Sequence, residues 1–185
     1  MPKIVIFSGS ARKGSFNSQI TAMAAQIAKG AGADIDLIHL ADFDLPIFNE
    51  DIETHPGTPR GATAFKKYLI EADAFIIATP EYNGFFPPLL KNAIDWATRK
   101  AEDEAVLAAF ADKHALLLSA SIGEGAGKRA LGHLRQQLQN IRVKIADESY
   151  SLGKAGDALA DKNAFKSSPS YFALERCVRA FVSSL

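Results

Sequence analysis

The sequence contains a single cysteine, Cys177, among its 185 residues. One cysteine excludes an internal disulfide and any metal or iron–sulfur site built from several cysteine ligands. A chain of this length buries roughly 70% of the surface of its unfolded state, so it folds without such cross-links. Cys177 lies in an apolar stretch of helical period, where we expect a packed, unreactive thiol, and this usage suits a reducing cytoplasm.

An excess of charge and long apolar runs are also absent. Lys and Arg together number 21, as do Asp and Glu. A balanced chain offers no broad cationic surface, so neither nucleic acid nor a membrane is an expected partner. No apolar run approaches the roughly 20 residues that span a bilayer, and the apolar stretch at 4–7 is too short for the core of a signal peptide. We therefore expect a cytoplasmic protein.

Apolar segments of strand length alternate with longer segments of helical period. The expected strands are 3–8, 34–40, 75–79, 114–120 and a shorter one at 142–146, and the expected helices are 17–30, about 60–72, 88–102, 127–139 and 158–183. Uninterrupted apolarity is typical of parallel strands covered on both faces, whereas the alternation in 34–40 suits the edge of a sheet. The pattern predicts one flavodoxin-like α/β domain over 1–185. It would be a three-layer sandwich whose five-stranded parallel sheet has the order 2-1-3-4-5, with helices on both faces.

Such a sheet binds ligands beyond the carboxyl ends of its strands, where the strand order reverses. The loops after 3–8, 75–79 and 114–120 are expected to meet there. Residues 43–61 form a further long, irregular connection, and connections of this length are usually functional or interfacial.

The first loop, 9–17, has the composition of a phosphate cradle. Gly9 and Gly14 let the backbone approach a ligand, and the loop runs into a helix N-terminus, which favours an anion. Short polar side chains and a cation are available there: Ser10, Arg12, Ser15 and Asn17. An ordinary polar turn with a good helix cap is the alternative.

This loop departs from both common nucleotide motifs. Ser15 and Phe16 stand where a nucleotide triphosphatase loop needs Lys and Ser or Thr, and Ala11 occupies the second glycine position of GxGxxG. The loop therefore suits a phosphate monoester bound without a metal, and nucleotide hydrolysis is disfavoured.

The second loop, within 79–96, is stiffened by prolines and carries aromatic side chains. Tyr82, Asn83 and Gly84 supply a ring for stacking and backbone amides for the edge of a planar heterocycle such as isoalloxazine. Alternatively, Tyr82 and Phe85-Phe86 only cover the end of the sheet. The apolar helix residues that follow suit the core or a subunit interface: Leu89, Leu90, Ile94 and Trp96.

The third loop, 119–130, is small and rich in glycine. It fits neither nucleotide motif, because its glycines fall at 123, 125 and 127 and Arg129 follows Lys128. Its small residues would let a flat ring lie against the backbone, or they form a flexible turn.

Together the three loops resemble those of the NADPH-dependent FMN reductase family, which has the flavodoxin-like fold. Its first signature, GSxRxxSxN, is matched in full over 9–17, and its second, PEYN followed by LKNxxDW, is matched at 80–83 and 90–96. The third, SxGxxGGxRA, is matched at 121–130 except that Ala126 replaces the first glycine of the pair. The segment LPIFNED at 45–51 is also similar to the family.

The resemblance implies non-covalent FMN, reduced by NADPH or NADH, in a homodimer or homotetramer. It implies an acceptor that is a small molecule: a quinone, ferric complex, chromate, azo compound or free flavin. The implied cofactor residues are Ser10, Arg12, Ser15, Phe16 and Asn17 around the phosphate, and Pro80, Glu81, Tyr82, Asn83, Gly84, Ser119 and Ser121 around the ring.

We predict no catalytic side chain and no metal ligand. Hydride transfer between a nicotinamide and a flavin needs no acid or base from the protein, the four histidines show no metal or triad spacing, and no GxSxG is present. Lys13, Lys128 and Arg129 are either contacts for a 2′-phosphate or solvated charges. Two other classes stay open: a flavodoxin-type electron carrier that does not use NAD(P)H, although carriers are usually acidic, and a phosphate-binding regulator.

Overall fold

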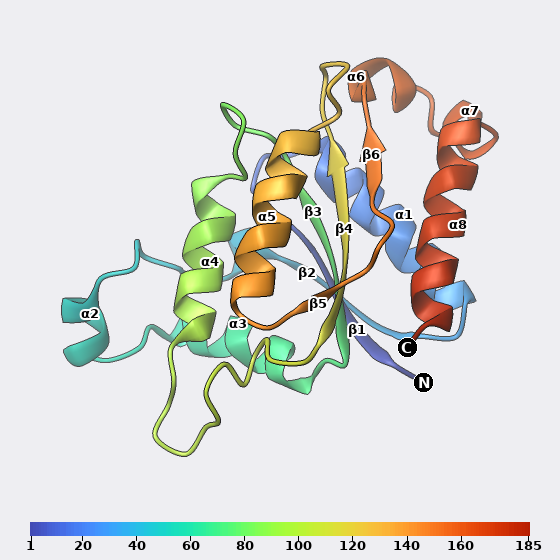
Figure 1. The fold of residues 1–185 in the computed structure, drawn as a ribbon. Helices are drawn as coiled ribbons and strands as arrows, with labels where there is room; N and C mark the ends of the chain where they lie inside the picture. The colour runs from blue at the N-terminus through green and yellow to red at the C-terminus, as the bar shows by residue number, and fades with distance from the viewer.

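The computed structural model describes residues 1–185 and contains a parallel sheet (Figure 1). Its strands are β1 Lys3–Ser8, β2 Asp34–His39, β3 Ala74–Thr79, β4 His114–Ala120, β5 Lys144–Ile145 and β6 Tyr150–Leu152. The order is β2-β1-β3-β4-β5, and β6 pairs with β4 as well. The predicted fold class and strand order are therefore confirmed, including the edge position of β2.

The fifth strand is interrupted, which the sequence did not predict. β5 pairs with the beginning of β4, at His114 and Ala115, whereas β6 pairs with its end, from Leu118 onward. Between these two pairings the chain leaves the sheet at 146–149. The predicted strand at 142–146 is thus only the first half of this edge, and the second half was missed because β6 is three residues long.

Helices cover both faces of the sheet (Figure 1). The helices are α1 Phe16–Gly30, the 3-10 turn η1 Leu40–Asp42, α2 Glu50–Thr54, α3 Arg60–Glu71, α4 Pro88–Thr98, α5 Lys128–Asn140, α6 Ala155–Ala158, α7 Lys162–Lys166 and α8 Pro169–Ser183. α1 and α8 pack on one face, and α3, α4 and α5 pack on the other. Because side chains alternate along a strand, Ile76 joins the first core and its neighbour Ile77 joins the second. None of these helices is long and apolar enough to cross a bilayer.

Three of the predicted segments need correction. The helix expected at 88–102 ends at Thr98, and the chain is extended at Arg99. The helix expected at 158–183 is divided into α7 and α8, because Ser168 caps a new helix whose first residue is Pro169, and α6 ends where the expected helix was to begin. The connection at 43–61 contains α2, and α3 already begins at Arg60.

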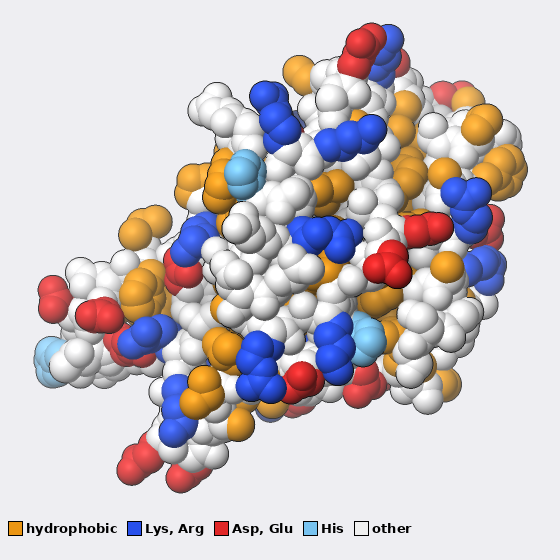
Figure 2. Space-filling model, in the orientation of Figure 1, with side chains coloured by type: hydrophobic (Ala, Val, Ile, Leu, Met, Phe, Trp, Pro, Cys, Tyr) orange, Lys and Arg blue, Asp and Glu red, His pale blue; other side chains and the backbone are white.

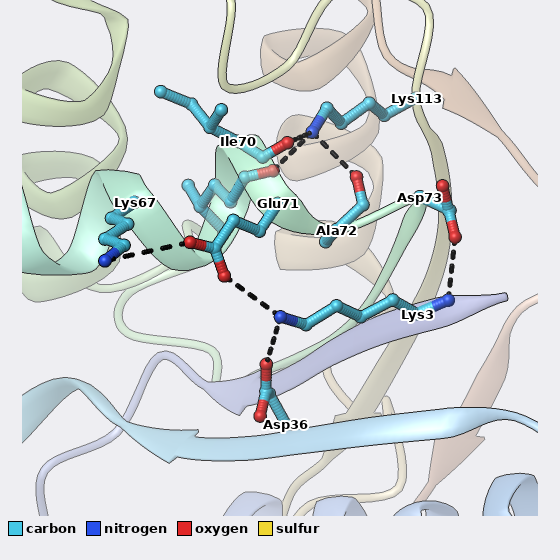
Figure 3. A network of polar contacts seen from close by, with 9 residues as sticks. Lys3, Asp36, Lys67, Ile70, Glu71, Ala72, Asp73 and Lys113 are labelled. Carbon is cyan, nitrogen blue, oxygen red and sulfur yellow. Dashed lines mark hydrogen bonds and ion pairs between the residues drawn. The ribbon is translucent and has the colours of Figure 1, made fainter.

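A polar network fastens the amino ends of the strands, at the end of the sheet opposite the three predicted loops (Figure 3). Lys3 Nζ lies 3.2 Å from a carboxylate oxygen of Asp36 and 3.0 Å from one of Glu71. The backbone N–H of Lys3 donates to the Asp73 carboxylate at 2.8 Å. These contacts join β1 to β2 and to the end of α3.

Lys113 completes the network at the C-terminus of α3. Its ammonium donates to the carbonyl oxygens of Leu69, Ile70 and Ala72, the last two at 2.6 and 2.7 Å (Figure 3). The free carbonyls at the end of a helix favour a cation in this position. Burial acts in the opposite direction and lowers the pKa of Lys113 to about 8, although Asp73 partly opposes the change.

A pH-dependent stability follows from Lys113. Because its pKa in the folded state, about 8, lies below the ordinary 10.5, the unfolded chain binds more protons between these two pH values. We expect the free energy of unfolding to rise with pH from 8 toward 10 relative to that of Lys113→Met. Urea unfolding of both proteins at pH 7, 8, 9 and 10 measures this difference. A constant difference across the series would contradict the role given to burial.

Candidate functional site

The three predicted loops meet beyond the carboxyl ends of β1, β3 and β4, at the upper end of the sheet in Figure 1. The first loop begins beside β3, where the backbone N–H of Gly9 donates to the carbonyl of Ala78 at 2.8 Å. A Cβ added to Gly9 would lie 3.0 Å from the Leu90 side chain of α4, so this close approach requires glycine.

The first loop presents unpaired donors to an anion. Ser15 is the N-cap of α1, and its hydroxyl oxygen accepts the N–H of Ser18 at 3.4 Å. The backbone N–H groups of Phe16 and Asn17 have no acceptor within the chain. Arg12 is exposed with no carboxylate within ion-pair distance, and its guanidinium lies 5.3 Å from the centre of the Phe16 ring. A free cation therefore stands beside the positive end of a 15-residue helix.

Ser10 shapes the start of this loop, because its hydroxyl oxygen accepts the N–H of Arg12 at 3.3 Å. Asn17 links the loop to β4. Its Nδ2 donates to the carbonyl of Ala120 and its Oδ1 accepts the N–H of the same residue, both at 2.9 Å, and the side chain is buried. The amide of Asn17 is thus engaged within the protein, and its backbone N–H is the group left for a ligand.

The second loop contains a tight hairpin. Tyr82 and Phe85 exchange both backbone hydrogen bonds, at 2.8 and 3.1 Å, and Asn83 and Gly84 between them have φ of 53° and 85°. Two positive φ angles are typical of the type I′ turn that an Asn-Gly pair favours. Tyr82 is 49% exposed at this turn, whereas Phe86 is buried. The aromatic residues therefore divide between two roles, since Phe86 covers the sheet and Tyr82 stays accessible.

Phe85 extends this aromatic surface toward α5. Its ring stacks on that of His133, with ring centres 4.4 Å apart, and packs on Phe86 at 4.6 Å. The half-exposed ring of Phe85 thus braces the hairpin against α5.

Glu81 joins the second loop to the third. Its Oε1 accepts from Nη2 and Nε of Arg129, at 2.8 and 3.0 Å, and its Oε2 accepts the N–H of Ala130 in the first turn of α5 at 3.3 Å. The carboxylate is therefore committed within the chain. Pro80 precedes Glu81, and the carbonyl oxygen of Pro80 accepts a hydrogen bond from the hydroxyl of Thr79 at 2.9 Å.

Ser119, at the end of β4, is fully buried and holds the third loop in place. Its hydroxyl donates to the carbonyl of Ala126, and its oxygen lies 3.2 Å from the hydroxyl oxygen of Ser151 in β6. A Cβ added to Gly127 would lie 3.0 Å from Ser119, and Gly127 has a φ of 75°. Ala126 also has a positive φ, 55°, which costs an L-residue about 1–2 kcal/mol. The left-handed backbone at both positions explains why a glycine pair suits this turn.

A fourth segment, formed by β6 and the start of α6, also lies at this edge and was not predicted. Ser121 donates its N–H to the carbonyl of Leu152 and accepts the N–H of Ala155, both at 2.9 Å. A Cβ added to Gly153 would lie 3.2 Å from carbonyl oxygens of the third loop. One added to Gly156 would lie 3.8 Å from the ring of Phe16. In the sequence, only Gly153 and Gly156 indicated this segment, because glycine permits the close backbone approach that the segment makes to the third loop and to Phe16.

The long connection before α3 is anchored on α4. Trp96 donates its indole N–H to the carbonyl of Pro46 at 2.7 Å, and the amide of Asn92 donates to the same carbonyl at 2.9 Å. Trp96 is fully buried, as are Leu90 and Ile94, so these residues belong to the core. Ile47, in contrast, is 75% exposed on the anchored segment.

Other reactive groups lie outside this region. No group of three or more His, Cys, Asp or Glu side chains is arranged to hold a metal ion. Cys177 is buried in α8, and burial raises the pKa of its thiol to about 11. The thiol is therefore protonated near neutral pH, in agreement with the expectation of a packed, unreactive side chain.

The parallel sheet and the loops at its carboxyl edge define a flavodoxin-like α/β protein. Among solved structures, the flavoenzyme NAD(P)H:(acceptor) oxidoreductase FerB from Paracoccus denitrificans superposes with a TM-score of 0.75 at 26% sequence identity. The superposition covers 99% of this chain and 96% of FerB. The likeness extends over almost the whole of both molecules.

The chain belongs to the NADPH-dependent FMN reductase family, whose model matches residues 2–157. The NAD(P)H-dependent FMN reductase of Pseudomonas aeruginosa is 42% identical over 142 residues, which is 76% of this chain and 71% of that protein. The NAD(P)H:quinone oxidoreductase of Solanum tuberosum is 39% identical over 134 residues, 72% of this chain. The match spans 66%, just under two thirds, of the length of that plant protein. The predicted family is confirmed, and both relatives are oxidoreductases by name.

The two hydrogen bonds between Asn17 and Ala120 should contribute to the free energy of unfolding. In Asn17→Ala, the N–H and carbonyl of Ala120 lose their partner in a buried setting, and we expect a loss of about 2–4 kcal/mol in the free energy of unfolding. Ser18→Ala is the matched control, because the Ser18 side chain makes no hydrogen bond, and a change within about 0.5 kcal/mol is expected there. Urea unfolding followed by circular dichroism measures both. Equal effects of the two substitutions would show that the link is energetically unimportant.

Proposed function

We propose that this chain is an FMN-dependent NAD(P)H:acceptor oxidoreductase whose 185 residues form one domain. The observation that carries the proposal is the unpaired Arg12 beside the free N–H groups of Phe16 and Asn17. This cradle has the charge and donors that a phosphate monoester requires. It lies at the same sheet edge as the hairpin that exposes Tyr82, so one ligand can use both. The names of the relatives support FMN as that ligand.

We assign the FMN phosphate to the first loop and the ring to the second and third. The phosphate residues are Ser10, Arg12, Ser15, Phe16 and Asn17, and the ring residues are Pro80, Glu81, Tyr82, Asn83, Gly84, Ser119 and Ser121. Asn17 and Glu81 contribute through their backbone, because their side chains are engaged elsewhere. The buried Ser119 acts by holding the third loop in place.

When bound, FMN supplies the chemistry that accepts a hydride from NAD(P)H and passes electrons to an acceptor. The chain's own residues bind and orient the cofactor. The turn leaves the backbone N–H groups of Asn83 and Gly84 without an acceptor in the chain, and Tyr82 presents its ring. No side chain needs to donate or accept a proton in this assignment, so we propose no catalytic residue.

A quinone is the acceptor that the names of several relatives give. The electron-carrier alternative is not favoured, because the chain lacks the acidic charge typical of carriers and its relatives are reductases. We also propose a cytoplasmic homodimer or homotetramer. Ile47, exposed on a segment that α4 anchors, supports an interface there.

The experiment that tests the function is a visible spectrum of the purified protein with FMN, followed by anaerobic addition of NADPH and then of a quinone. We expect a protein-bound flavin band that bleaches with NADPH and returns with the quinone. A bound flavin that stays oxidised with both NADPH and NADH would favour the electron carrier. The absence of bound flavin would favour the phosphate-binding regulator.

Arg12 tests the assignment of the phosphate. Replacing Arg12 with Ala removes a charge-assisted hydrogen bond of about 1.5–3 kcal/mol, which corresponds to a roughly ten- to hundredfold higher Kd for FMN. The quenching of FMN fluorescence on titration measures this Kd. Arg60→Ala removes another exposed arginine, from the start of α3, and should leave the Kd unchanged. If both variants bind FMN as the native protein does, the phosphate lies elsewhere.

A further inference from the structure

A cavity lies on the open edge of the sheet, between α5 and α8, on the face that Figure 2 shows. Its volume is about 540 Å³, within the range of small-molecule sites. It forms where the fifth strand is interrupted, because neither β5 nor β6 pairs with Leu117 of β4. Leu117, Tyr150 and Ser151 line it from the sheet. None of its lining residues belongs to the loop 9–17.

Cations outnumber carboxylates around this cavity. Lys128 and Arg135 line it from α5, Arg176 lines it from α8, and Glu148 is the one carboxylate among the lining side chains. None of these three cations has a carboxylate within ion-pair distance, and Arg135 donates only to the carbonyl of Ala146, at 3.0 Å. Figure 2 shows Lys and Arg side chains over α5 and beside α8 around the hollow, with acidic side chains between them. A chain with zero net charge thus has a local positive excess here.

The uncharged polar groups of the cavity are also donors. Ser149, Ser151 and Ser170 supply hydroxyl groups. The hydroxyl of Tyr150, in contrast, is a buried polar atom without a hydrogen-bond partner, and it is enclosed by the protein rather than exposed to the cavity. Burial raises the pKa of Tyr150, so this hydroxyl keeps its proton at physiological pH.

We propose that this cavity binds a small phosphorylated anion at a site separate from the FMN site. Phosphate oxygens match the three cations and the hydroxyl donors, because they accept several charge-assisted hydrogen bonds at once. The cavity adjoins the flavin loops through Lys128, the first residue of α5, and through the contact between Ser151 and Ser119. The phosphate has two possible sources: the phosphate groups of a nicotinamide dinucleotide that extends from the flavin, or a separate phosphorylated metabolite.

Isothermal titration calorimetry with inorganic pyrophosphate tests the site. The protein carries Arg12→Gln, so that the first loop does not hold the probe, and FMN is present in excess. We expect one binding event that the double substitution Arg135→Gln and Arg176→Gln weakens at least tenfold. Arg60→Gln is the matched control and should leave the affinity unchanged. No binding, or equal binding by the double variant, would overturn the proposal whether or not FMN binds.

Steady-state kinetics distinguish the two sources. Competition between pyrophosphate and NADPH, with a raised KM and unchanged kcat in the double variant, identifies the phosphates of the dinucleotide. Calorimetric binding without competition identifies a separate metabolite.

Discussion

Parallel strands must all end at the same edge of a sheet, and this constraint places every part of the candidate site. A chain that runs β1, β3 and β4 in parallel has to return by a crossover helix after each strand. The loops that begin those crossovers therefore lie side by side, although their sequences are as far apart as Gly9 and Gly127. The largely apolar strands beneath them are buried on both faces, so they hold this edge in fixed positions.

Within that edge, most polar side chains bind other parts of the protein. Asn17 bonds to Ala120, Glu81 to Arg129 and Ser119 to Ala126, and each bond joins two loops or two parts of one loop. The groups left for a ligand are backbone N–H groups, the guanidinium of Arg12 and the ring of Tyr82. A site built in this way is preorganised, because the bonds that fix its geometry do not have to form when a ligand binds.

Because many polar side chains of the site bind other parts of the protein, the sequence could predict the site only in part. The central strands were found because buried parallel strands are continuous apolar runs, and β2 was found from its alternation of polar and apolar residues. The residues of the first two motifs were enough to locate their loops. The side chains that a motif assigns to a ligand can instead bind the protein, as Asn17 and Glu81 do, and only three-dimensional contacts reveal this. The division of the C-terminal helix at Pro169 was readable from its Ser-Pro pair. The short β6 carried no comparable signal, since three residues are too few to define a period.

The interrupted edge strand connects these observations. A continuous fifth strand would pair along the whole of β4, whereas β5 and β6 leave its middle without a partner on that side. The pairing of β6 with the end of β4 places Ser151 beside Ser119 and brings Gly153 against the third loop. The break itself opens the cavity beside Leu117. The two parts of this edge therefore have different roles: β6 supports the third loop of the candidate flavin site, and the gap between β5 and β6 opens a cationic cavity next to it. A ligand in that cavity would contact the β6 segment that supports the third loop, so the two sites share a structural element through which binding at one can affect the other.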